Sequence, residues 1–197
     1  VQSGGIKIDS NGFDVATSQA LTGTGGLEKL GAGSLTLNAA STYTGPTLVS
    51  AGTLKLELNS SITSAVTVEA GAALAGAGAI AGDLSFNSGA KFVFSLTQTL
   101  LANGATVSFA DFGIDDLVGL SSATTVGLYN LIGGTAIINT NGLSNLGAAN
   151  AADLGDGKSA YFTEGSLQVN VVPEPSTYAL LVLAGLGLAG HVIRRRR

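Results

Sequence analysis

The chain has 197 residues, of which 29 are glycine, while charged residues make up 11% and aromatic residues 6%. It contains no cysteine, and its single histidine, His191, lies close to the C-terminus. Residues 1–172 therefore have no disulfide and no thiolate- or histidine-based catalysis or metal binding. The same stretch carries five lysines against twelve acidic residues, which argues against nucleic acid as a partner.

Residues 1–20 are expected to form an N-terminal β segment. They begin with "VQSGGIKIDS", which has no initiator methionine and neither the basic region nor the apolar core of a signal peptide. We therefore expect the sequence to be truncated at its start, or its export signal to have been removed.

One phrase recurs four times within residues 21–99, as "LGAGS", "VSAGT", "VEAGA" and "FNSGA". Strand-like apolar residues follow each copy. A unit of about 19 residues cannot bury its own apolar face, but stacked units pair their backbones about 4.8 Å apart. The repeat predicts an all-β fold, a short β-solenoid with one unit per turn, here called a rung. An ordinary β-sandwich with evenly spaced turns is the alternative. The glycines expected at the rung corners are Gly33, Gly52, Gly71 and Gly89, spaced by 19, 19 and 18 residues.

The stretch "GGLEKLGAGSLTLNAASTYTGPTLVSAGTLKL", residues 25–56, resembles the autotransporter-associated β-strand repeat. One departure is Thr42, where that family often has asparagine. The resemblance implies a right-handed parallel β-helix of the kind found in exported bacterial surface proteins, and it implies no enzymatic activity. The positions that match the family pattern are Lys29, Gly31, Gly33, Leu35, Leu37, Tyr43, Gly45, Thr47 and Ala51 to Leu54.

Residues 100–171 are less regular. "TVSFADF", "VGLYNLIGG", "TAIIN", "SAYFT" and "GSLQVNVV" are typical of short strands between turn residues. We expect either further rungs or an antiparallel, β-rich cap over the open end of the solenoid, because an exposed terminal rung invites edge pairing. The residues themselves leave both arrangements open.

The C-terminal segment, residues 172–197, has a different character. Residues 178–193 contain no acidic residue, lysine or arginine, and as a helix they would span about 24 Å. We predict one C-terminal hydrophobic, transmembrane helix that is short for a bilayer core of about 30 Å. The arginines behind it would stay on the cytoplasmic side. Pro173 and Pro175 disfavour a helix across Val172–Glu174, so an extended, accessible segment is expected there.

This tail closely resembles the PEP-CTERM protein-sorting signal. The resemblance implies recognition by an exosortase, a membrane-embedded protease or transpeptidase of Gram-negative bacteria. It also implies transient residence in the inner membrane, removal of the tail, and delivery of the body to the cell surface, outer membrane or biofilm matrix. Exopolysaccharide and other surface proteins are the further partners expected. The recognition element would be Pro173, Glu174, Pro175 and Ser176, and the membrane-retention charges would be Arg194, Arg195, Arg196 and Arg197.

The sequence thus predicts an exported structural or adhesin-like protein with no enzymatic activity, cofactor or metal. One alternative is a β-helical polysaccharide-active enzyme, with Asp111, Asp115 and Asp116 as its candidate acids. No acidic pair stands out by spacing, and the body lacks both arginine and tryptophan. The other alternative is a surface protein anchored permanently by a single span. "DLGDGK" at 153–158 is expected to be a plain turn rather than a calcium loop.

Overall fold

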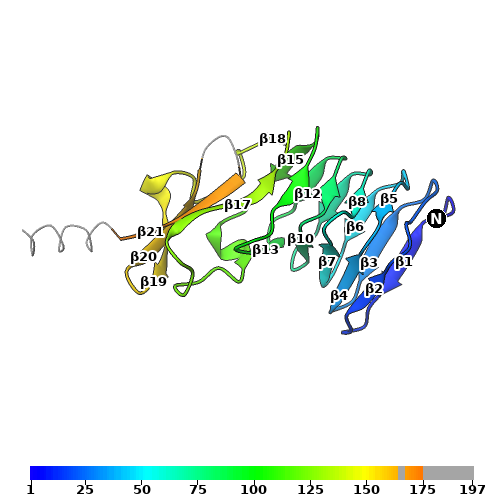
Figure 1. Cartoon of the computed structure of the whole chain (residues 1–197), viewed down its shortest axis with the longest axis horizontal. Coiled ribbons are helices and arrows are strands. Elements are labelled where there is room, and N and C mark those ends of the chain that lie inside the picture. Colours follow the sequence, from blue (N-terminus) through cyan, green and yellow to red (C-terminus); the bar gives the residue numbers. More distant parts are fainter. Residues whose placement is uncertain (164–166, 175–197) are drawn as a thin grey trace, which may run out of the picture.

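The structure is a computed structural model that describes residues 1–163 and 167–174. Within these residues, strands form three long sheets around a common interior, and the helical elements are two short 3-10 turns, η1 (Ile114–Asp116) and η2 (Ala148–Asn150). Figure 1 shows an elongated body with β1 at one end and β19 to β21 at the other. The predicted all-β solenoid is confirmed, with about five rungs. The C-terminal helix predicted at 178–193 lies outside the described residues.

Each complete rung contributes one strand to each sheet. The first sheet contains β1 (Ile6–Asp9), β3 (Leu27–Leu30), β6 (Thr47–Val49), β9 (Val66–Val68), β12 (Leu84–Phe86), β15 (Thr106–Phe109) and β18 (Ile137–Ile138). The second contains β2 (Val15–Thr17), β4 (Ser34–Leu37), β7 (Thr53–Leu56), β10 (Ala73–Gly76), β13 (Lys91–Val93) and β16 (Leu117–Val118). The third contains β5 (Ala40–Ser41), β8 (Ser61–Ile62), β11 (Ala79–Ile80), β14 (Leu100–Ala102), β17 (Gly127–Gly133), β19 (Ala152–Gly155), β20 (Lys158–Phe162) and β21 (Leu167–Pro173).

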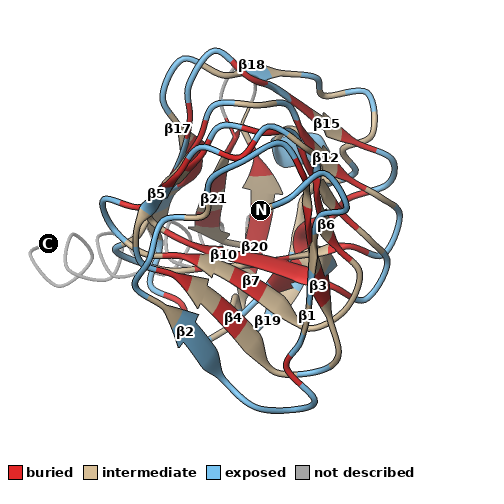
Figure 2. Ribbon diagram, turned by 90° about the vertical axis from the view of Figure 1, so that its right-hand side faces the viewer, coloured by how far each residue is buried: buried red, intermediate tan, exposed pale blue. Residues whose placement is uncertain are grey.

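The apolar residues after the corner glycines build the core of the second sheet. Leu35 pairs with Leu54, Leu54 with Leu74, and Leu74 with Phe92, all in parallel register. All four side chains are buried, because alternate residues of a strand point to the same face. Figure 2 shows the buried segments along the inner sides of the sheets and the exposed ones at the outer turns. Parallel pairing of successive rungs rules out the β-sandwich alternative.

The third sheet was not predicted from the sequence. Its solenoid strands are two or three residues long and place one or two side chains inward. Rung length also increases toward the C-terminal end of the solenoid. Leu35 and Leu54 are 19 residues apart, whereas Thr106 pairs with Ile137, 31 residues later. The longer C-terminal rungs explain why the regular period fades after residue 100.

The stretch from residue 100 to 171 contains both arrangements that the sequence left open. β14, β15 and β16 continue the parallel ladders, and β17 pairs with β14 in parallel. β17 then pairs with β21, β21 with β20, and β20 with β19, all antiparallel. We call β19, β20 and β21 the cap. The cap therefore extends the third sheet directly.

An aromatic cluster joins the cap to the solenoid core. The ring of Phe112 lies 5.3 Å from that of Phe86 in β12 and 6.1 Å from that of Phe162 in β20, centroid to centroid. All three side chains are buried. The solenoid and the cap thus share one continuous hydrophobic core.

Candidate functional site

The four corner glycines lie at equivalent bends between the first and second sheets. Their φ angles are +82°, +67°, +77° and +79° in chain order, a region that side chains disfavour. The space around them differs. A Cβ on Gly52 would lie 2.3 Å from the carbonyl oxygen of Gly33, whereas one on Gly71 would meet nothing within 4 Å. Close approach between rungs therefore adds to the backbone requirement at Gly52 but not at Gly71.

Lys29 is buried inside the first of these corners. It occupies an inward position of β3, and its Nζ donates to the carbonyl oxygens of Leu30 at 2.8 Å, Gly31 at 2.8 Å and Ala51 at 3.1 Å. All three N–H donors are used. Burial lowers the pKa of Lys29, and the negative charge of Asp9 partly opposes this effect. The ammonium ties two successive rungs together, so its role is structural.

A chain of buried hydroxyl groups crosses the next two rungs. The Tyr43 hydroxyl lies 2.5 Å from Oγ1 of Thr47, which lies 3.0 Å from Oγ of Ser64. All three residues are buried, and burial raises the pKa of Tyr43. The repeat motif thus contributes polar bonds to the interior as well as its glycines and leucines. Lys29, Tyr43 and Thr47 are motif positions, but nothing in the sequence indicated that their polar groups would be buried.

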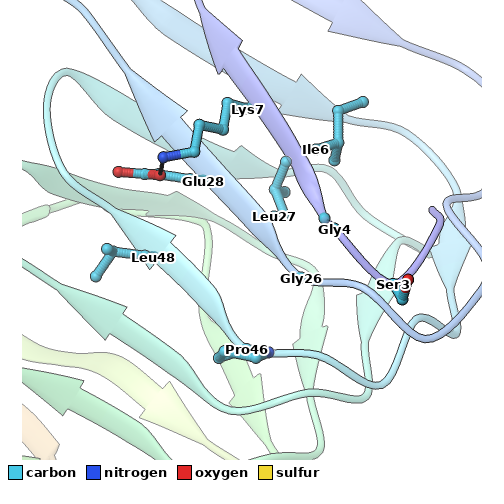
Figure 3. Close-up of a pocket in the computed structure, with 10 residues that line it drawn as sticks. Ser3, Gly4, Ile6, Lys7, Gly26, Leu27, Glu28, Pro46 and Leu48 are labelled. Carbon is cyan, nitrogen blue, oxygen red and sulfur yellow. Dashed lines mark ion pairs between the residues drawn. The ribbon is translucent and has the colours of Figure 1, made fainter.

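The outer face of the first sheet carries a shallow pocket near the N-terminal end (Figure 3). Its volume is about 240 Å³, and Gly4, Gly26, Pro46 and Leu48 are among its lining residues. Lys7 on β1 reaches across to Glu28 on β3, with 2.7 Å between ammonium and carboxylate, as the dashed line in Figure 3 marks. The hydrogen bond from Lys7 lowers the pKa of Glu28. This pair links neighbouring strands.

The three acids considered for catalysis, Asp111, Asp115 and Asp116, differ in burial and in hydrogen bonding. Asp116 accepts from Nζ of Lys91 at 2.6 Å and from the backbone N–H of Gly113 at 2.8 Å. Asp111 and Asp115 are exposed. Within the described residues, no group of three or more histidine, cysteine or acidic residues is arranged to hold a metal ion. The carboxylate of Asp116 thus links β13 to η1.

The predicted turn at "DLGDGK" connects β19 to β20. Asp153 accepts the backbone N–H of Gly155 at 2.6 Å, and Asp156 and Gly157 both have positive φ angles. These are features of a tight hairpin turn. The turn matters because its end lies beside the predicted sorting element.

The start of the predicted sorting element is the end of β21. Lys158 pairs with Pro173, and Ser159 with Val172, in the antiparallel register of β20 and β21. The backbone N–H of Glu174 donates to the carbonyl oxygen of Gly157 at 2.8 Å. Val172–Glu174 is extended, as expected, but it is half-buried and paired on one side. The segment is therefore less accessible than predicted, because β20 lies against it.

Pro173 fits this strand because of the side that its nitrogen faces. Backbone groups of alternate residues point to opposite sides of an antiparallel strand. Glu174 bonds toward β20, so the backbone groups of Pro173 point toward the β17 side. The pairing of β17 with β21 ends at Gly127 and Val171, and a proline lacking an N–H is tolerated at such a free edge.

The remaining predicted sorting residues cannot be placed. Pro175, Ser176 and Arg194 to Arg197 lie outside the described residues, as does the predicted helix at 178–193. Among residues 1–163 and 167–174, no helix has the length and apolar character needed to cross a bilayer.

Two family models match the chain. Residues 27–56 match the passenger-associated-transport-repeat, and residues 171–197 match the PEP-CTERM protein-sorting motif. No curated protein and no solved structure matches it. The matches support both resemblances drawn from the sequence. Together with the β-solenoid fold, they point to an exported structural protein that is sorted to the surface.

Proposed function

We propose that this chain is a structural, adhesin-like or matrix-associated surface protein, whose C-terminal tail an exosortase recognises and removes. The observation that carries the proposal is the PEP-CTERM match at residues 171–197, which follows a solenoid containing a passenger-associated-transport-repeat. The body would act through the extended outer faces of its sheets, in contact with exopolysaccharide or other surface proteins.

Each part of the tail has a separate role in this proposal. The predicted helix at 178–193 would hold the protein in the inner membrane for a time, with Arg194 to Arg197 on the cytoplasmic side. Pro173, Glu174, Pro175 and Ser176 would be read by the enzyme. Because β21 is part of the cap and β1 lies at the opposite end of the body (Figure 1), the first rungs would point away from the membrane.

Removing the recognition element is expected to stop sorting. The variant Pro173→Ala/Glu174→Ala/Pro175→Ala should keep its tail and accumulate in the inner-membrane fraction, because the enzyme loses the side chains that it reads. The measurement is the mass of the C-terminal peptide in each membrane fraction and in the medium.

The matched control changes a proline and an acid within the solenoid. Pro46 is the only proline outside the recognition element, and Pro46→Ala/Glu57→Ala should be sorted like the unaltered chain. Tail removal that continues at its normal rate in the triple variant would contradict the proposed recognition.

A further inference from the structure

Val172–Glu174 belongs to two functional units at once. It lies near the start of the segment that matches the sorting motif, which begins at residue 171. It also comprises the last two residues of β21, which pair with β20, and the residue after them. An enzyme that recognises an extended peptide by adding it as a strand to its own sheet needs a free backbone edge on that peptide. Where Val172 and Pro173 pair with β20, one of the two backbone edges of this segment is already occupied.

The β20 side of this contact is firmly held. Nζ of Lys158 donates to the carbonyl oxygens of Ser122 at 2.6 Å and Thr124 at 3.0 Å, and Ala160 pairs with Ala152 of β19. The end of β21, by contrast, has lost its β17 neighbour beyond Val171. Separation of the two strands would therefore occur by release of β21.

The side chains of the paired segment are nevertheless open to contact. A hollow of about 430 Å³ runs beside them, lined by Val172, Pro173, Glu174, Tyr161 and Asp153, among others. An enzyme could touch one face of the element in the folded cap while its backbone stays bonded to β20.

We propose that the pairing of Val172–Glu174 with the start of β20 is a latch that limits removal of the tail. The exosortase acts on the fraction of molecules in which the end of β21 has separated from Gly157, Lys158 and Ser159. When opening is fast compared with cleavage, the rate of cleavage follows the population of the open form. This inference rests on the proposed function, because it assumes that the tail is removed at all.

A reversible crosslink tests the latch without changing Pro173 or Glu174. Ser159 and Val172 are directly opposite and both line the hollow. The bond from Glu174 to Gly157 makes Ser159 and Val172 a hydrogen-bonded pair, for which Cα atoms lie about 5.5 Å apart, within the range that a disulfide bridges. The chain has no cysteine of its own, so Ser159→Cys/Val172→Cys introduces one defined disulfide.

The full-length variant is incubated with membrane vesicles from the exosortase-containing host, and release of the tail is followed by mass spectrometry. The oxidised protein should lose its tail at least about tenfold more slowly than its own reduced form, and added reductant should restore the rate. A control disulfide at Ser85→Cys/Ser108→Cys, where the hydroxyls of neighbouring rungs lie 3.1 Å apart, should leave the rate unchanged.

Two results would overturn the latch. If the oxidised and reduced forms of the Ser159–Val172 variant release the tail equally fast, release of β21 does not limit processing. If the crosslink speeds release, the paired strand is the form that the enzyme prefers. Failure of the unaltered chain to lose its tail would instead contradict the proposed function, so the two failures are distinguishable.

Discussion

Gly52→Ala is expected to destabilise the solenoid by about 2 to 5 kcal/mol. The substitution puts a side chain at a φ of +67°, which costs about 1 to 2 kcal/mol. Its Cβ would also lie 2.3 Å from the carbonyl oxygen of Gly33 and 2.8 Å from Nζ of Lys29. Relieving these contacts forces the backbones of two rungs apart, at a cost of about 1 to 3 kcal/mol.

Gly71→Ala is the matched control. The residue occupies the same corner one rung later, with a φ of +77° but open space around the added Cβ. It should lose only about 1 to 2 kcal/mol. Urea denaturation followed by far-ultraviolet circular dichroism gives both values, and equal losses for the two variants would show that close approach at Gly52 adds nothing.

Lys29→Met is expected to lower the free energy of unfolding by about 2 to 3 kcal/mol. The ammonium bonds three half-buried carbonyl oxygens in the corner, and a carbonyl left without a partner costs about 1 to 3 kcal/mol. The carbonyl of Leu30 keeps the backbone N–H of Ser10 at 3.2 Å. Part of this loss is offset because a buried charge no longer has to be desolvated. Lys55→Met, at a partly exposed ion pair with Glu57, should change stability by less than about 0.5 kcal/mol. A Lys29→Met protein as stable as the unaltered chain would contradict the structural role.

The stability difference between the unaltered chain and Lys29→Met should also depend on pH. Burial lowers the pKa of Lys29 in the folded state, so between that lowered pKa and the ordinary value near about 10.4 the unfolded chain binds more protons. The contribution of Lys29 to the free energy of unfolding therefore rises with pH across this window. It is lost as the pH falls through the lowered pKa, below which both states hold the proton. Urea titrations at several pH values would check this, and a constant difference throughout would contradict it.

The first two sheets were predictable because their strands carry a local signal. Leu35, Leu54 and Phe92 follow corner glycines at nearly constant spacing, and this spacing alone favours stacked rungs. The third sheet has no comparable pattern. Its strands are short and include small or polar residues such as Ala40 and Ser61, so they become strands only because the other two sides of each rung fix their position.

The polar interior and the latch depend on contacts between distant residues. Lys29 looks like a surface residue in the sequence, and its burial depends on carbonyls of its own corner and on that of Ala51 in the next rung. Val172–Glu174 was correctly predicted to be extended, since Pro173 and Pro175 disfavour a helix. Its pairing with β20 depends on how the hairpin at residues 156–157 folds back, which the order of residues in the tail does not reveal.

The central claim is that the described fold is the body of a surface protein and that the segment beginning at the end of β21 is a removable sorting signal. The most direct test is the mass of the C-terminal peptide of the unaltered protein, recovered from the envelope and the medium of its native host. We expect the mature surface pool to end near Pro173 to Thr177, with everything after that region removed. An intact Arg197 in that pool would contradict the claim and identify the tail as a permanent anchor.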